Sequence, residues 1–423
     1  MGTDLEQDLS QNVSKGQIRT VPKCPKKGNQ KMLELIISKK QSQEKIALVE
    51  NGNLVEYYEE DEDTNRKEGN IYIGKVKDII NGMQSAFIDI GTEKNSFIHL
   101  KDVLPKIDEK KQEKKINVDI KDVIKPNEKL LVQVKKDSNE KKGARVSTHI
   151  NLPGKYVVLM PNTDIITVSQ KIENEKEQQR LIKLVQENIS KGNGAVIRTS
   201  AIKKDKEIIE DIHDLETKWN EIQKKYKENK GSNTLIYKAE NIVEKMIIDL
   251  ADQKIENIIT DNQKEYESIQ EIKKKTPELA KTKIQLEKSN IFDKYELEKQ
   301  IQKLQNRKIW LKCGGFITID KTEALTAIDV NTGKYTGSKN LEQTLYKVNE
   351  EATIEIAKQI RLRDIGGIII IDYIDMNKQE NKQKIQKLLE EKLKQDRSKT
   401  QVEGFTKLEL MEMTRKHICS HKE

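Results

Sequence analysis

The sequence predicts a multidomain α+β protein with a small β-barrel and a mixed α/β segment near its C-terminus. The chain has 423 residues, which is more than one hydrophobic core usually covers. Alternating strand patterns occupy residues 69–149, polar helix patterns occupy 203–304, and strands and helices alternate after residue 305. Apolar residues make up 35% of the chain and are grouped in periodic segments, so we expect a folded protein with a heavily solvated surface.

Charge and targeting signals limit the class of protein. The formal net charge is +8, which favours a polyanionic partner such as nucleic acid over a membrane surface. No stretch approaches the roughly 18 to 20 apolar residues of a transmembrane helix, and the N-terminus lacks the apolar core of a secretory signal. We therefore expect a soluble intracellular protein with no membrane span. Residues 1–31 contain early acids, so we expect a disordered extension and not a transit peptide.

Residues 69–149 predict a five-stranded β-barrel of the oligonucleotide-binding kind. Apolar alternation in IYIGKV and AFIDI marks strands between glycine-containing turns, and two further strands fit around 130–135 and 144–149. Phe87 and Phe97 fall on neighbouring strands and could stack on bases, although both rings could equally belong to the barrel core. Three lysines could follow the phosphates of a bound strand: Lys75, Lys136 and Lys142.

Residues 203–304 predict long helices, as in EIIEDIHDLETKWNEIQKKYKENK and YELEKQIQKLQNRK. Their lysine and glutamate runs are typical of helix faces that are exposed to solvent.

Two hydrophobic strands in residues 305–423 each end in an aspartate. ALTAIDV reaches Asp329, which Asn331 and Gly333 follow, and the isoleucine-rich IIIIDYIDM predicts a fully buried strand that surfaces at Asp372. A long helix separates them, and a strand–helix–strand unit would place the two strands parallel and near each other. The first acid alone could merely precede a turn, since Asn and Gly are turn residues. Two carboxylates at one end of a sheet, however, suit Mg²⁺, which could activate water and neutralise a phosphodiester.

From about Met32 to the end, the sequence resembles the ribonuclease E/G family of endoribonucleases. The resemblance is carried by TEALTAIDVNTG, NEEATIEIAKQIRLRDIGGIIIIDYIDM, GFTKLELMEMTRK and NIYIGKV…GMQSAFIDIGTEKNSFIHL. It implies a Mg²⁺-dependent endoribonuclease that hydrolyses single-stranded RNA, with mRNA and rRNA precursors as substrates, and leaves a 5′-phosphate and a 3′-hydroxyl. The implied role is RNA processing and mRNA decay.

The resemblance also implies a division of the chain into regions. These are a disordered extension at 1–31, an RNase H-like part at 32–67, an inserted S1 RNA-binding domain at 68–148, a 5′-sensor region at 149–243, a second RNase H-like part at 244–304 and a DNase I-like catalytic subdomain at 305–423.

Catalytic roles follow from the same resemblance. In that family the acids that match Asp329 and Asp372 hold the catalytic Mg²⁺, and the residue that matches Asn331 supports them by hydrogen bonding. Arg361 and Arg363, in the RLRD segment, are further candidates for phosphate contacts.

RNA-binding roles are implied in two other regions. The S1 aromatic residues of the family match Phe87 and Phe97, with a lysine at Lys142. The family's sensor of a 5′-monophosphate matches three residues: Arg198, Thr199 and Val158. The local sequence alone allows a plainer interpretation, in which Arg198 makes an ordinary surface ion pair.

Zinc is not expected. Family members commonly carry a Cys-Pro-x-Cys zinc link soon after the MTRK block, but this chain ends at HICSHKE with Cys419 alone. A zinc-linked dimer is therefore not predicted, and a homodimer or homo-oligomer would have to form by packing. An alternative metal site would use Cys419, His417 and His421.

Two inferences concern the cellular setting and a rival function. The isoleucine-, lysine- and asparagine-rich composition suggests an AT-rich genome, which predicts a plastid-encoded protein of the stroma, with the bacterial cytoplasm as the alternative. The rival function is a catalytically silent RNA-binding protein whose acids merely cap strands. Retention of both acids together with Asn331 argues against it.

Overall fold

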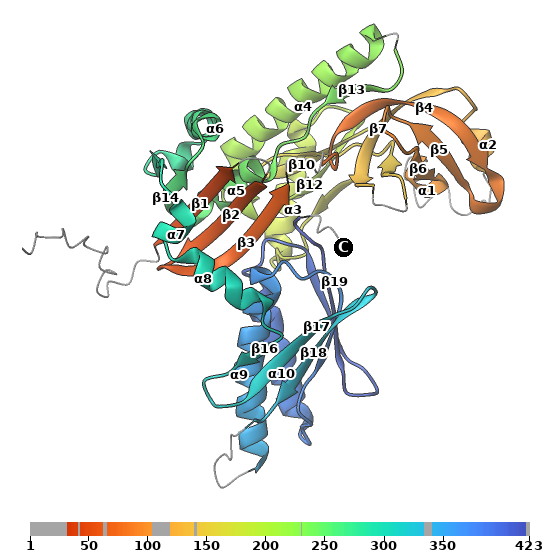
Figure 1. The fold of residues 1–423 in the computed structure, drawn as a ribbon. Coiled ribbons are helices and arrows are strands. Elements are labelled where there is room, and N and C mark those ends of the chain that lie inside the picture. Colours follow the sequence, from red (N-terminus) through yellow and green to blue (C-terminus); the bar gives the residue numbers. More distant parts are fainter. Residues whose placement is uncertain are drawn as a thin grey trace, which may run out of the picture.

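The computed structural model describes residues 32–40, 43–61, 66–103, 119–138, 142–229, 231–333 and 341–419. The predicted extension at 1–31 and His421 lie outside these ranges. The described residues form four β-sheets with helices packed against them, which confirms the α+β character. The barrel and the C-terminal sheet form two arms, and the other two sheets lie between them (Figure 1).

The first sheet joins segments that are more than 200 residues apart, because Leu33 pairs with Ile255. Its strand order is β15-β14-β1-β2-β3. The strands are β1 (Leu33–Lys40), β2 (Gln43–Glu50), β3 (Asn53–Asp61), β14 (Ile255–Thr260) and β15 (Lys283–Leu286). Four helices pack on this sheet: α5 (Ile242–Leu250) and α6 (Gln263–Lys275) on one side, α7 (Ile291–Lys294) and α8 (Leu297–Gln302) on the other.

The prediction of long helices over 203–304 is confirmed for α4 (Asp205–Glu228), but the segment also contains strands. Besides β14 and β15, this segment contains β13 (Thr234–Tyr237), and the interior strand β14, IENIIT, buries its isoleucines against the helices on the two faces of the sheet. Short isoleucine runs are compatible with either secondary structure, and pairing with the distant β1 decides in favour of a strand.

The predicted five-stranded barrel is confirmed. Its strands are β4 (Ile71–Ile80), β5 (Ser85–Asp89), β6 (Ser96–His99), β7 (Lys129–Lys136) and β8 (Arg145–Ser147), and pairing of β4 with β7 closes it. Short helices α1 (Leu100–Val103) and α2 (Ile120–Val123) cover its ends. The strand β13 pairs with β4 and so joins the barrel to the neighbouring region.

The third sheet has the order β11-β12-β10-β9. Its strands are β9 (Leu152–Pro153), β10 (Val157–Pro161), β11 (Ile166–Val168) and β12 (Asn193–Ile197), and the helices α3 (Glu175–Asn188) and α4 (Asp205–Glu228) pack against it. Helix α4 buries Ile208, Ile212, Leu215 and Trp219, whose spacing of three to four residues places them on one face.

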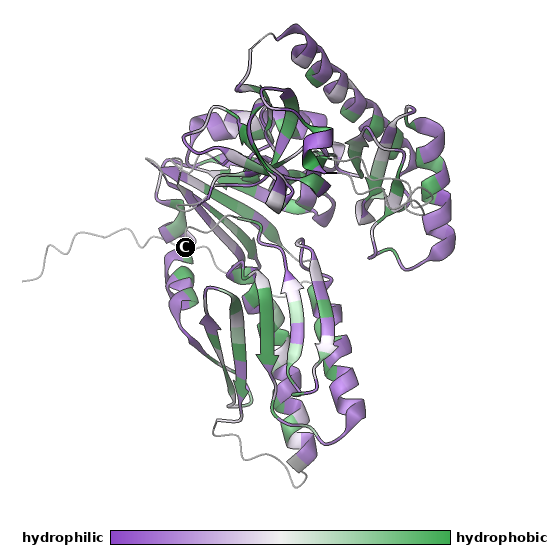
Figure 2. Ribbon diagram, turned by 90° about the vertical axis from the view of Figure 1, so that its right-hand side faces the viewer, coloured by the Kyte–Doolittle hydropathy of each residue, from purple (hydrophilic) through white to green (hydrophobic). Residues whose placement is uncertain are grey.

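The fourth sheet has the order β16-β17-β18-β19-β21-β20. Its strands are β16 (Lys308–Trp310), β17 (Phe316–Lys321), β18 (Leu325–Asn331), β19 (Gly367–Asp372), β20 (Thr400–Phe405) and β21 (Met411–Arg415). Helices α9 (Leu341–Leu362) and α10 (Gln379–Leu393) pack on one face only. Figure 2 shows the sheet with these helices behind it, so the face toward the viewer is the one they leave open.

The expectation that IIIIDYIDM forms a fully buried strand was therefore wrong. Ile369 and Ile371 are buried under the helices, but Ile368 on the opposite face is 50% exposed. The strands β20 and β21 were not predicted. None of the helices in the described ranges combines the length and the apolar character that crossing a bilayer requires.

Candidate active site and RNA-binding surfaces

The two predicted acids lie side by side on the open face of the fourth sheet. Strands β18 and β19 are parallel, and Asp329 is the register partner of Asp372. Both aspartates are exposed, whereas Ile328 and Ile371, which precede them, are buried under the helices. Because side chains alternate across a strand, both carboxylates project from the open face.

Asn331 contacts this pair directly. Its Nδ2 donates a hydrogen bond to Oδ2 of Asp329 over 2.5 Å. The turn interpretation also holds, since Gly333 has a φ of +59° and a Cβ there would lie 2.5 Å from the carbonyl oxygen of Gly314. The segment after Asp329 therefore turns tightly and supports the site at the same time.

The electrostatics of the pair favour a cation. The pKa of Asp372 is raised by partial burial and by repulsion from Asp329 and Asp375. Asp375 is exposed and lies three residues after Asp372. Mg²⁺ prefers oxygen ligands and is typically held by one or two carboxylates while it keeps several waters. The donor set of two exposed carboxylates fits Mg²⁺, although the described residues contain no cluster of three or more His, Cys, Asp or Glu side chains.

Helix α9 positions the loop that follows Asp372. The buried Asn349 donates from Nδ2 to the carbonyl oxygen of Ile374 over 2.8 Å, and its Oδ1 accepts from the Ile374 N–H over 3.1 Å. One turn further along, the Thr353 hydroxyl lies 2.9 Å from the Tyr373 hydroxyl. These positioning residues were not predicted from the sequence. The available signal was two polar residues, four apart, on the buried face of an amphipathic helix.

The barrel presents the two predicted phenylalanines on its outer surface. Phe87 and Phe97 are direct cross-strand partners on β5 and β6, with ring centroids 6.3 Å apart. Both rings are partly exposed, and neither belongs to the buried barrel core, so the core alternative does not hold. Phe97 is in register with Arg145, which is in register with Lys136. Two aromatic and two basic side chains thus follow one another across β5, β6, β8 and β7.

Lys142 lies near the same strand. A Cβ on Gly143 would be 1.9 Å from the carbonyl oxygen of Asn95, so only glycine allows this loop to lie against the start of β6. Lys142 is exposed, whereas Lys75 on β4 is only partly exposed. Arg145 was not predicted from the sequence. It follows Lys142 closely and makes a bidentate pair with Asp102 at 2.9 to 3.1 Å.

The three predicted sensor residues lie at one end of the third sheet. Val158 on β10 is opposite Val196 on β12, two residues before Arg198, and Thr199 is exposed at the start of a short 3₁₀ helix. The Arg198 guanidinium donates to the carbonyl oxygen of Gly154 at 2.8 Å and pairs with Asp249 at 2.7 Å. Its side chain is 34% exposed, so the guanidinium is partly open to solvent.

The arginines of the RLRD segment lie away from the acid pair. Arg361 is partly buried and pairs with the buried carboxylate of Glu56 on β3, at 2.7 Å. Arg363 donates to the side-chain oxygen of Gln359 and to the carbonyl oxygen of Asn306. A phosphate contact by Arg361 would require the loss of its pairing with a buried carboxylate.

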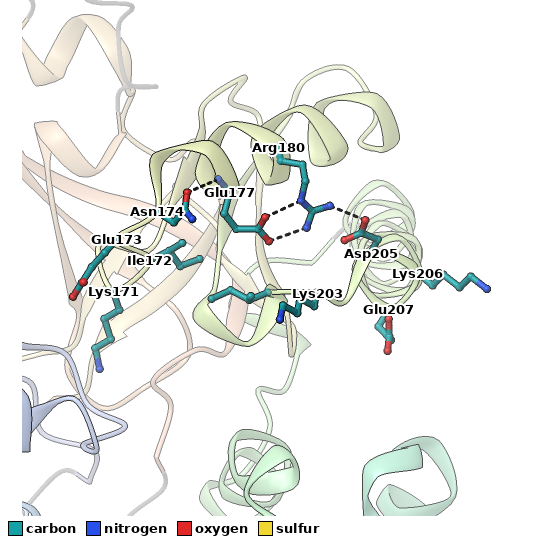
Figure 3. Close-up of a pocket in the computed structure, with 11 residues that line it drawn as sticks. Lys171, Ile172, Glu173, Asn174, Glu177, Arg180, Lys203, Asp205, Lys206 and Glu207 are labelled. Atoms are coloured by element: carbon teal, nitrogen blue, oxygen red, sulfur yellow. Dashed lines mark hydrogen bonds and ion pairs between the residues drawn. The ribbon is translucent and has the colours of Figure 1, made fainter.

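A separate open pocket of about 800 Å³ lies beside the third sheet (Figure 3). Three lysines and Arg180 are among the residues that line it, and Figure 3 shows Arg180 between two carboxylates. The pairs are with Glu177 at 2.8 Å and Asp205 at 2.7 Å. Because both partners neutralise this guanidinium, the pocket offers no uncompensated arginine for an anion.

The alternative metal site near the C-terminus is not assembled by the described residues. Cys419 is buried in the core of the first sheet, and burial raises the pKa of its thiol. The His417 ring nitrogen Nδ1 lies 2.9 Å from the carbonyl oxygen of Asp364.

An exposed acid pair on an open sheet, combined with an oligonucleotide-binding type of barrel, suits a protein that acts on nucleic acid. A model of the ribonuclease E/G family matches residues 151–418. Ribonuclease G of Escherichia coli strain K12 is 38% identical over 389 residues, which cover 90% of this chain and 79% of that protein. Ribonuclease G of Haemophilus influenzae is 37% identical over 391 residues, covering 91% of this chain and 79% of that protein.

Ribonuclease E of Escherichia coli strain K12 is 32% identical over 392 residues, which cover 92% of this chain but only 37% of that longer protein. The chain therefore belongs to the ribonuclease E/G family, as the sequence motifs predicted. Members of this family are endoribonucleases.

Proposed function

We propose that this protein is a Mg²⁺-dependent endoribonuclease that hydrolyses single-stranded RNA during RNA processing and mRNA decay and leaves a 5′-phosphate and a 3′-hydroxyl. The observation that carries the proposal is the register pairing of Asp329 with Asp372 on the open face of the fourth sheet. Family membership supports the reaction class.

The acid pair and Asn331 divide the work at the site. Asp329 and Asp372 would hold Mg²⁺, which supplies a Lewis acid that activates water and offsets the charge of the phosphodiester. Asn331 donates a hydrogen bond to Oδ2 of Asp329 and so fixes the orientation of the carboxylate. The other carboxylate oxygen, Oδ1, would be the one that binds the metal ion. The two hydrogen bonds between the Asn349 side chain and the Ile374 backbone hold the loop after Asp372 and so limit the movement of Asp372.

The open face is compatible with a long single strand as substrate. A sheet face that no helix covers could admit a chain from the side, and this sheet lies on the same side of the molecule as the barrel (Figure 1). The barrel would act as an S1 RNA-binding domain, in which Phe87 and Phe97 stack on bases while Lys136 and Lys142 contact phosphates.

A 5′-monophosphate sensor completes the proposal. Arg198 and Thr199 would bind the terminal phosphate beside Val158, through charge-assisted hydrogen bonds that a 5′-hydroxyl cannot replace. Since Arg198 pairs with Asp249, the phosphate would have to replace that carboxylate or share the guanidinium with it.

The regional assignments and the cellular setting belong to the proposal as well. We assign the first sheet to the RNase H-like parts and the fourth sheet to a DNase I-like subdomain. The relatives named above are bacterial, and the plastid setting rests on composition alone.

The test is cleavage of a single-stranded RNA oligonucleotide in Mg²⁺ and in EDTA. Asp329→Asn and Asp372→Asn should each reduce cleavage to the level of the EDTA control while RNA affinity stays within a few-fold, because neither substitution alters the barrel. Glu403→Gln, at an exposed position on β20 of the same sheet, is the matched control. RNA binding without Mg²⁺-dependent cleavage by the wild type would instead favour the silent RNA-binding protein.

A further inference from the structure

Two rows of side chains cross the open face of the fourth sheet. In the first row, Lys308 is in register with Thr318, Thr318 with Asp329, and Asp329 with Asp372. One row is thus occupied by a cation at β16 and by the acid pair at β18 and β19. The acid pair therefore belongs to a wider surface that reaches the edge strand β16.

The second row adjoins the first and is aromatic. Trp310 is in register with Phe316, and Phe316 with Asn331, the residue that contacts Asp329. The two ring centroids are 5.3 Å apart in an edge-to-face arrangement. Trp310 is 57% exposed, so a large part of its indole faces solvent. Register places Phe316 one strand from the acid pair and Trp310 two strands from it.

Lys308 connects the two rows. Its Nζ lies 3.5 Å from the Phe316 centroid and 4.3 Å from the Trp310 centroid. The ammonium group is therefore held beside the rings by cation–π attraction. A nucleotide offers a base for the aromatic rings and a phosphate for this cation.

Helix α9 fixes the hairpin that carries the rings. Glu351 accepts hydrogen bonds from the N–H groups of Lys312 and Cys313 at 2.9 and 2.8 Å, and both residues lie in the turn between β16 and β17. The same helix holds the loop after Asp372 through Asn349. The aromatic pair and the acid pair are thus positioned by one rigid element, which reduces the entropy that binding must overcome.

We propose that Trp310, Phe316 and Lys308 form a base-stacking subsite, which holds an unpaired nucleobase of the RNA next to the scissile phosphate at Asp329 and Asp372. The inference rests on the proposed function, since it takes the acid pair as the reaction centre. RNA is favoured over a protein partner because the exposed indole lies beside a cation on β16 and two strands from the acid pair to which the proposed function assigns the metal ion. This subsite is separate from the barrel and binds a nucleotide next to the scissile phosphodiester bond.

Kinetics provide the first test. Trp310→Ala should weaken RNA binding about 10- to 100-fold, seen as a higher KM, because base–aromatic stacking is typically lost on this scale. Trp310→Phe should recover most of that loss, since a ring remains. Leu408→Ala is the control, because Leu408 is 80% exposed in the β20–β21 turn of the same sheet and should leave KM unchanged.

An abasic scan locates the contact. The wild type should lose affinity when one particular nucleotide near the cleavage site lacks its base, and Trp310→Ala should be insensitive to that same lesion. Equal sensitivity of both proteins at every position would overturn the proposal.

Fluorescence provides a readout that does not require cleavage. The chain contains two tryptophans, and Trp219 is buried, so Trp219→Phe leaves Trp310 as the reporter. In a Trp219→Phe, Asp372→Asn protein, RNA should quench the emission. If that protein does not fold, the kinetic comparison still decides, because it keeps Trp219.

The outcomes separate the two proposals. Cleavage with a KM that does not depend on Trp310 would overturn the subsite and leave the endoribonuclease standing. If RNA quenches the Trp310 fluorescence but the wild type does not cleave RNA, the endoribonuclease proposal is overturned and the nucleobase-binding site remains. Dissociation of a dimer by Trp310→Ala, with unchanged RNA affinity, would identify an interface between copies of this chain and overturn the subsite.

Discussion

The acids of this protein occur in two contrasting settings, one buried against arginines and one exposed against another acid. Glu56 is fully buried, yet Arg397 and Arg361 outweigh the effect of burial and lower its pKa to about 2. The pKa of Asp372 moves the other way, raised by partial burial and by Asp329 and Asp375. A carboxylate that is paired with arginines of the same chain, like Glu56, stabilises the fold. A carboxylate that lies beside other carboxylates, like Asp372, is stabilised by a cation bound from solution.

A second buried cluster extends the first setting. Arg415, in the MTRK block, donates to Asp364 and Asp396, each at 2.7 Å, and the Arg415 and Asp364 side chains have no exposure at all. Asp364 also accepts the backbone N–H groups of Ile418 and Cys419. This cluster therefore ties the segment after β21 to the rest of the molecule.

The largest effect on stability is expected for Arg415→Met. Removing this guanidinium leaves two buried carboxylates uncompensated, which should lower the free energy of unfolding by about 3 to 5 kcal/mol. Arg307→Met is the matched control, because the Arg307–Asp320 pair is exposed and should contribute little to stability. Urea denaturation measures both. Equal destabilisation by the two substitutions would remove the distinction between buried and exposed pairs.

Glu56→Gln should be the next largest change, and its effect should depend on pH. The folded pKa of about 2 lies below the ordinary value of 4.5, so Glu56 contributes stability above pH 4.5 and loses it as the pH falls toward 2. The difference corresponds to about 3 kcal/mol. The destabilisation by Glu56→Gln should therefore be full at pH 7 and shrink below pH 4.5, measured by urea titrations. A constant effect over this range would contradict the lowered pKa.

Asp372→Asn should not destabilise the fold as Glu56→Gln does, and its effect on stability should be smaller. Without Mg²⁺, the substitution removes a repelled charge, so the thermal midpoint at neutral pH should stay the same or rise slightly. Saturating Mg²⁺ should stabilise the wild type by about 1 kcal/mol through preferential binding to the folded state, and should not stabilise the variant. Differential scanning calorimetry measures both. A Mg²⁺-induced shift that persists in Asp372→Asn would place the ion elsewhere.

Structure could be predicted from the sequence where the interacting segments lie near each other along the chain. Asp329 and Asp372 could be predicted because each ends a strand of one strand–helix–strand unit, and the structure pairs those strands. The strand β14 could not be predicted, because its pairing partner β1 is more than 200 residues away. The countercharges of Glu56 were hidden for the same reason, since Arg361 and Arg397 follow it by more than 300 residues.

Arg198 combines features of the two settings, since it is paired with a carboxylate but remains partly exposed. Among the substitutions considered, Arg198→Ala should have the smallest effect. Its guanidinium pairs with Asp249, which also lies 3.7 Å from Arg397 of the Glu56 cluster, but the Arg198 side chain remains 34% exposed. On the proposed sensor assignment, a 5′-monophosphate would replace Asp249 or share the guanidinium with it, and would gain charge-assisted hydrogen bonds that a hydroxyl end cannot make. The same assignment predicts weaker binding of a triphosphate, because its added bulk and charge would not suit a site for one phosphoryl group.

The wild type should thus cleave a 5′-monophosphorylated oligonucleotide several-fold faster than the same RNA with a 5′-hydroxyl or a 5′-triphosphate. Arg198→Ala should remove this preference, while Arg180→Ala should keep it, because Arg180 is already neutralised by Glu177 and Asp205. The measurement is the initial rate on the three RNAs at subsaturating concentration. If the preference survives Arg198→Ala, the pair with Asp249 is purely structural and Arg198 belongs with the buried arginines.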